Sequence, residues 1–62
     1  MQTIDLSGPE GNAFHLMGLA TKWGKQLDMD TNDILLRMQS GDYDNLVDVF
    51  EEAFSNVVTI ER

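Results

Sequence analysis

The chain contains no cysteine, a single proline and a single histidine among its 62 residues. Without cysteine it has neither a disulfide framework nor a thiolate metal site, so its stability must come from packing or from association with another chain. No apolar run approaches the ~18–20 residues of a membrane span, and no basic segment precedes an apolar one as in a signal peptide. We therefore expect a soluble protein of the cytoplasm.

Basic residues are also scarce, because four lysines and arginines face eleven acids and leave a net charge of −7. The imbalance is local: the segment 28–52 holds eight acids against Arg37 alone, whereas the residues before and after it are balanced. A concentrated negative charge argues against direct binding to nucleic acid or to an anionic membrane. It favours a protein partner with a basic surface.

Residue types that carry catalysis are few. The only histidine, His15, falls on the polar side of a predicted helix. Ser7 and Glu10 are near it in the sequence, but nothing specifies an arrangement in which either would work with it in catalysis. A chain of this length also has little volume for a pocket that excludes water. We expect no enzymatic activity and no cofactor.

The segment 28–33, with the sequence Asp-Met-Asp-Thr-Asn-Asp, imitates the opening of a calcium-binding EF-hand loop. The pattern fails at its sixth position, where Asp33 replaces the glycine of the sharp turn. It fails again at the twelfth, where Gln39 replaces the bidentate glutamate. An aspartate-rich turn that caps a helix explains the segment better, and no metal site is predicted.

Hydrophobic periodicity predicts one α+β domain over residues 1–62, with the order β-α-α-α-β. Thr3–Leu6 alternates polar and apolar side chains, and residues 57–61 are rich in β-branched side chains, so both segments are expected to be strands. Apolar positions spaced for helices cover about 12–27, 31–39 and 44–55. We expect three short helices on a two-stranded ribbon of the N- and C-terminal strands. Alternation does not decide whether that ribbon is parallel or antiparallel.

Side chains that accept a hydrogen bond from a helix N-terminus precede each predicted helix. Two candidate caps stand at each start: Ser7 or Asn12, Asp30 or Thr31, and Asp42 or Asp44. Gly41 is expected to end the second helix in the left-handed conformation. Phe14, which falls off the apolar arc of the first helix, is expected to fold back onto the N-terminal strand.

The acids of the third predicted helix lie on one side of it and form a candidate docking surface. Such a surface speeds association with a basic partner, although a solvated helix face that keeps a small protein soluble is an equally simple interpretation. Aromatic residues often carry most of the energy of an interface. The residues proposed to bind a partner are Tyr43, Asp44, Asp48, Glu51 and Glu52.

The first predicted helix is broadly apolar, with Leu16, Leu19 and Trp23 along one side. A chain this short buries only about 60% of its unfolded surface, so an apolar side without internal partners is a candidate for self-association. The alternative hypothesis is therefore a homodimer with a structural or scaffolding role. The simpler interpretation is that the first and third helices pack together under the ribbon.

The opening Ile4-Asp5-Leu6-Ser7-Gly8-Pro9-Glu10-Gly11-Asn12-Ala13-Phe14, together with Leu16-Met17-Gly18 and Ser40-Gly41-Asp42-Tyr43, resembles a group of small uncharacterised bacteriophage and bacterial proteins. This resemblance implies a phage or bacterial cytoplasmic setting and carries no known activity. Small acidic phage proteins often bind and inhibit a host protein. The resemblance therefore implies an interaction module that modulates a host protein.

Overall fold

A computed structural model describes residues 2–62 of the chain. The element order is strand β1 (Gln2–Asp5), a short 3-10 helix η1 (Pro9–Gly11), helices α1 (Ala13–Gln26), α2 (Thr31–Met38) and α3 (Tyr43–Ala53), and strand β2 (Val58–Glu61). The predicted β-α-α-α-β order is confirmed.

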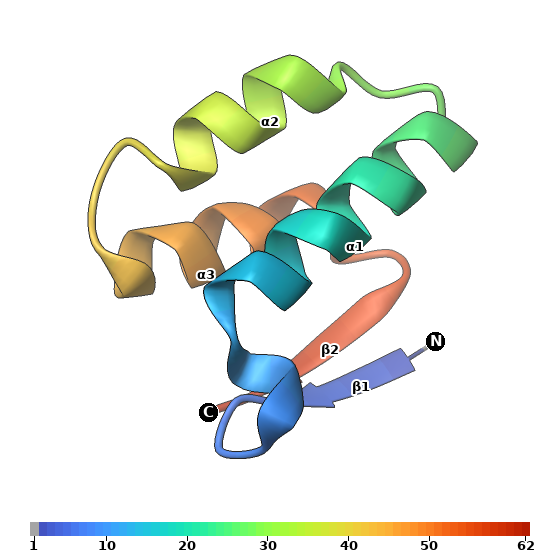
Figure 1. Cartoon of the computed structure of the whole chain (residues 1–62). Coiled ribbons are helices and arrows are strands. Elements are labelled where there is room, and N and C mark those ends of the chain that lie inside the picture. The colour runs from blue at the N-terminus through green and yellow to red at the C-terminus, as the bar shows by residue number, and fades with distance from the viewer. Residues whose placement is uncertain (1) are drawn as a thin grey trace.

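The two strands form a parallel ribbon, which settles the orientation that the sequence left open. Gln2 pairs with Val58 and Ile4 with Ile60. Figure 1 shows three layers, with the ribbon at one side, α1 and α3 in the middle, and α2 on α1 and α3 away from the ribbon.

A single apolar core lies between the ribbon and the helices. Alternation along each strand turns Ile4 and Val58 inward, and both are buried. Each helix contributes its apolar stripe, so the core draws on every layer. The buried residues are Ile4, Leu16, Ala20, Ile34, Met38, Leu46, Val47, Val49, Phe50, Phe54 and Val58.

Aromatic packing joins α1 to α3, as the simpler interpretation of the apolar helix predicted. The ring centroid of Trp23 lies 5.8 Å from that of Phe50 and 5.7 Å from that of Phe54. Phe50 and Phe54 are themselves 5.3 Å apart and almost fully buried. Tilted and edge-on pairs at these separations are the favoured aromatic geometries. This cluster closes the core at the end where α3 leads into β2.

Each helix begins at one of its two predicted caps. Asn12 Oδ1 accepts hydrogen bonds from the backbone N–H groups of Phe14 and His15, at 2.8 and 3.4 Å. Asp30 Oδ1 accepts from the N–H of Asp33 at 3.1 Å. These side chains satisfy donors that a helix N-terminus otherwise leaves without partners. Local chemistry thus sets where the helices start.

Two local expectations are wrong. No described glycine, Gly41 included, has a positive φ; the left-handed residue is Asp28, with φ of 57°, just after α1. Aspartate tolerates this conformation because its short polar side chain can hydrogen-bond locally. Phe14 does not fold back onto β1, since it is 80% exposed on α1. Leu16, Ala20 and Gly24 form the buried side of α1 instead.

Candidate interaction surface

The acidic face of α3 consists of Asp44, Asp48, Glu51 and Glu52. Residues three and four apart share one side of a helix, so Leu46, Val47, Val49 and Phe50 turn inward and the acids turn outward. The side chains of Asp48 and Glu52 are 66% and 77% exposed. The structure thus brings together all four acids that the sequence proposed for partner binding.

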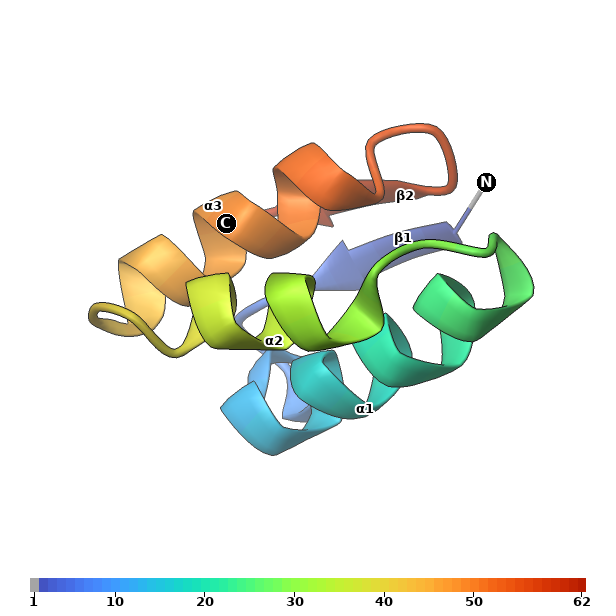
Figure 2. The same cartoon turned by 90° about the horizontal axis from the view of Figure 1, so that it is seen from above.

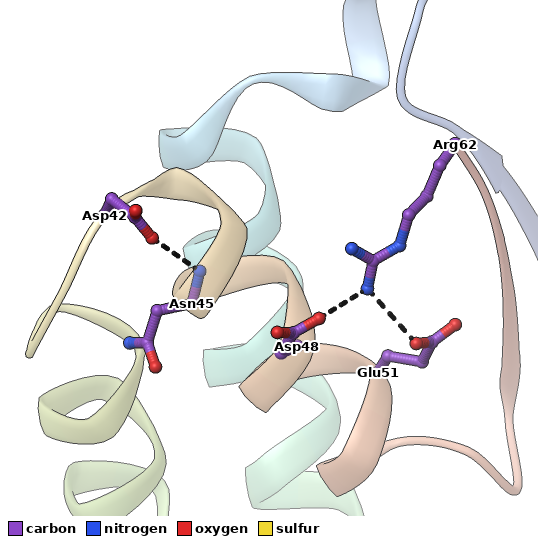
Figure 3. Close-up of polar contacts among 5 residues, drawn as sticks. All are labelled: Asp42, Asn45, Asp48, Glu51 and Arg62. Atoms are coloured by element: carbon purple, nitrogen blue, oxygen red, sulfur yellow. Dashed lines mark hydrogen bonds and ion pairs between the residues drawn. The ribbon is translucent and has the colours of Figure 1, made fainter.

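Asp42 has a different role from these acids, because it caps the helix. Its Oδ1 accepts a hydrogen bond from the backbone N–H of Asn45 at 2.9 Å (Figure 3). Asp44, in the first turn of α3, lies where a negative charge interacts favourably with the helix dipole. Both acids at this end of the helix therefore contribute to the stability of α3.

Arg62 lies against the acidic face. Its Nη2 donates to Asp48 Oδ1 at 2.7 Å and to Glu51 Oε1 at 3.3 Å (Figure 3). The hydrogen bond to Asp48 holds the pKa of the Arg62 guanidinium above its ordinary value. Sequence reasoning missed this contact because Arg62 lies outside the acidic segment 28–52, in the part of the chain whose charges balance. Its position depends on the path of β2 past α3, which no local pattern reveals.

A second arginine borders the same face. Arg37 Nη2, on α2, lies 3.7 Å from Glu52 Oε1, while its Nη1 lies 3.8 Å from Asp33 Oδ2. Exposed pairs at such distances contribute little to stability, about 0–1 kcal/mol each. Guanidinium groups of this chain therefore lie at both borders of the acidic face. Among the residues the structure describes, Asp44 forms no ion pair.

Tyr43, the aromatic residue proposed as an anchor, opens α3 at the end where the acidic face begins. It is 40% exposed, and its hydroxyl donates a hydrogen bond to the backbone carbonyl of Gly11. The hydroxyl is therefore held against η1, and less than half of the residue's surface remains accessible to solvent. Tyr43 holds α3 to η1 and also adds an apolar border to the acidic face.

The residues proposed for self-association do not form one exposed surface. The prediction that Leu16 takes part in self-association is wrong. Leu16 is fully buried in the core and does not face a second chain. Trp23 packs on Phe50 and Phe54, and it is only partly exposed. Leu19 is likewise partly buried against the core. Self-association through α1 would therefore rely on side chains other than Leu16.

An open pocket of about 270 Å³ lies between the end of α1 and the start of the ribbon. Amide and apolar side chains line it: Gln2, Trp23, Gln26, Leu27, Asn56 and Val57. This lining offers neither an acid, a base nor a nucleophile, so the pocket supports no acid–base or covalent chemistry of its own.

His15 lies apart from this pocket. Its Nε2 is 3.9 Å from Glu10 Oε2, with both side chains more than 40% exposed. Across residues 2–62, no three histidine, cysteine, aspartate or glutamate side chains are grouped so that they could hold a metal ion.

Comparison of the chain with protein-family models, with curated proteins and with solved structures gives no match. Over the described residues, no helix combines the length and the apolar character needed to cross a bilayer.

Proposed function

We propose that the chain is a small, acidic, non-catalytic protein-interaction module that binds a basic surface of another protein through the acidic face of α3. The observation that carries this proposal is the position of Arg62, whose guanidinium lies within hydrogen-bond distance of Asp48 and Glu51. A side chain of the kind expected on a basic partner thus already fits between two of the proposed docking residues.

The chemistry favours arginine on the partner. A planar guanidinium forms charge-assisted hydrogen bonds to two carboxylates at once, whereas an ammonium acts as a point charge. Because the acids are exposed, they contribute more to the rate of association than to affinity. Affinity needs apolar contacts as well, and Tyr43 supplies an exposed ring beside the acids.

The resemblance to small phage and bacterial proteins suggests which partner to seek. In this proposal the partner is a bacterial host protein, and the chain is a phage-encoded modulator or inhibitor that acts in the host cytoplasm. The concentrated negative charge supports a protein partner rather than nucleic acid, because phosphate backbones would be repelled.

The test is capture of partners from bacterial lysate with the tagged chain, with nuclease present, followed by binding kinetics with the purified partner. Neutralising the face with Asp48→Asn, Glu51→Gln and Glu52→Gln should slow association and flatten its dependence on salt. The matched control removes the same charge elsewhere, with Glu10→Gln, Asp28→Asn and Glu61→Gln.

Equal losses in the two triple variants would mean that only net charge matters and that the face has no specific role. Unchanged kinetics in the first variant would make the acids a solvated surface that serves solubility. Loss confined to the first variant, with the control variant behaving as wild type, supports the docking surface.

A further inference from the structure

One stripe of α1 has a composition that the core does not explain. Phe14, Gly18 and Lys22 follow one another four residues apart, so they lie in a row on the exposed side of the helix. Phe14 is 80% exposed, and a Cβ added to Gly18 would meet nothing within 4 Å. The row thus places an exposed aromatic ring, a gap and a cation on consecutive turns.

Gly18 weakens the helix in which it lies. Glycine in a helix interior is less favourable than alanine by about 1 kcal/mol. No neighbour within the chain explains why position 18 has no side chain, because an added Cβ would meet nothing. A glycine on a helix surface lets another backbone approach closely. Gly24, by contrast, is explained internally, because a Cβ there would lie 2.6 Å from Thr31 Oγ1.

The row is complementary to itself. If two copies of α1 cross antiparallel with Gly18 at the two-fold axis, the residue four positions before it faces the residue four positions after it on the other helix. Phe14 then lies opposite Lys22 of the partner subunit, and the second such pair follows by symmetry. An ammonium within about 6 Å of an aromatic ring centroid is attracted to the ring face.

The charge distribution also favours α1 as the side of the molecule through which two copies meet. α1 contains no acidic residue, whereas the chain as a whole has a net charge of −7. Figure 2 shows α1 and α3 at opposite sides of the molecule with α2 between them. A contact through α1 therefore keeps the acidic faces of two copies apart, where repulsion is least.

We propose that α1 forms a symmetric antiparallel contact with a second copy of this chain, with Gly18 at its centre and Phe14 of each copy against Lys22 of the partner subunit. The contact leaves the acidic face of α3 open, so the dimer presents two such faces. This inference does not depend on the proposed function, and it replaces the buried Leu16 with exposed residues as the basis for self-association.

Sedimentation velocity over about 1 µM to 1 mM of the full chain tests the proposal, because a small contact should have a dissociation constant on the order of 10–100 µM. Phe14→Ser and Lys22→Glu should each weaken dimerisation about tenfold or more. Leu36→Ser is the matched control, since Leu36 is also a largely exposed apolar residue, 71% accessible, on α2.

Gly18→Leu separates the contact from any effect on folding. Leucine favours the helix over glycine, so the melting temperature of dilute protein should rise, while the added side chain blocks the close approach and dimerisation should weaken about tenfold or more. If Gly18 affected only folding, Gly18→Leu would change the melting temperature and the strength of dimerisation in the same direction.

Three results would overturn the proposal. The first is a monomer at every concentration. The second is a dimer that Leu36→Ser weakens as much as Phe14→Ser does. The third is a dimer that is weakened by neutralising Asp48, Glu51 and Glu52, which would show that the lysines of α1 bind the acidic face of α3 in a head-to-tail manner.

Discussion

Two glycines of this chain should respond in opposite ways to the same substitution. At Gly18, on the open side of α1, a Cβ meets nothing within 4 Å, whereas at Gly11 it would lie 2.1 Å from the backbone oxygen of Leu6. Gly18→Ala should therefore stabilise the fold and Gly11→Ala should destabilise it. Because the chemical change is identical, the difference isolates the surroundings of each site.

The magnitudes follow from the local geometry. Gly18→Ala should raise the free energy of unfolding by about 1 kcal/mol, which corresponds to about 4–8 °C in a domain of this size. At Gly11 the added carbon is roughly 1 Å or more too close to backbone atoms, which have no rotamer to change. Overpacking costs about 1–3 kcal/mol, and the rigid contact places Gly11→Ala near the upper end.

These changes are large for this chain. Stability of about 0.05–0.15 kcal/mol per residue gives 62 residues only about 3–9 kcal/mol in total. Thermal and urea unfolding, followed by far-ultraviolet circular dichroism at low micromolar concentration, should show Gly11→Ala melting on the order of 10–20 °C lower. A Gly11→Ala variant as stable as wild type would refute the close approach of η1 to the segment after β1.

Three further substitutions test the core, a helix cap and a carboxylate. Phe50→Ala should cost about 3–5 kcal/mol and abolish cooperative unfolding at physiological temperature, as calorimetry would show, because the ring is fully buried. Asp42→Ala should lower the free energy of unfolding by about 1 kcal/mol, and Asp44→Ala by less, in urea titrations. Ser7→Ala should raise the pKa of Asp5 toward 3.8 in an NMR titration, because the Ser7 hydroxyl and then its N–H lower that pKa. Since a lowered carboxyl pKa stabilises the fold above the unfolded pKa, the Asp5 contribution in the wild type is lost as the pH falls below 3.8 through the folded value.

Features set by neighbouring residues were largely predictable from the sequence. Caps such as Asn12 and Asp42 define helix starts through hydrogen bonds that span two or three residues. The fold class also followed, because three consecutive segments of helical periodicity lie between two terminal segments of strand character. The mistake at Gly41 arose because glycine is only permissive of the left-handed conformation, whereas the chain adopts it at Asp28.

The orientation of the ribbon follows from the path of the helices rather than from the strands. In Figure 1 the chain reverses direction at each element, so that after α1, α2 and α3 it enters β2 in the direction of β1. The alternation of Ile4 or Val58 suits either orientation. The strand sequences alone therefore do not decide between parallel and antiparallel pairing.

The acidic face was predictable, but its borders were not. Asp48 and Glu51 share a helix face by spacing alone, while the guanidinium of Arg62 reaches them from another element. The exposure of Phe14 also depends on the folded chain. Its angle on the helix places it outside the buried arc, but only the structure shows that it remains 80% exposed.

Parallel pairing also determines how the fold responds to tension. A force that pulls Gln2 and Glu61 apart acts on opposite ends of two strands that run in the same direction, as β1 and β2 do in Figure 1. The hydrogen bonds of the ribbon then bear the load in shear, all together, and cannot open one after another. A small domain with modest equilibrium stability is thereby given a resistant mechanical clamp between its first and last strands, because forced unfolding depends on the unfolding rate rather than on that equilibrium.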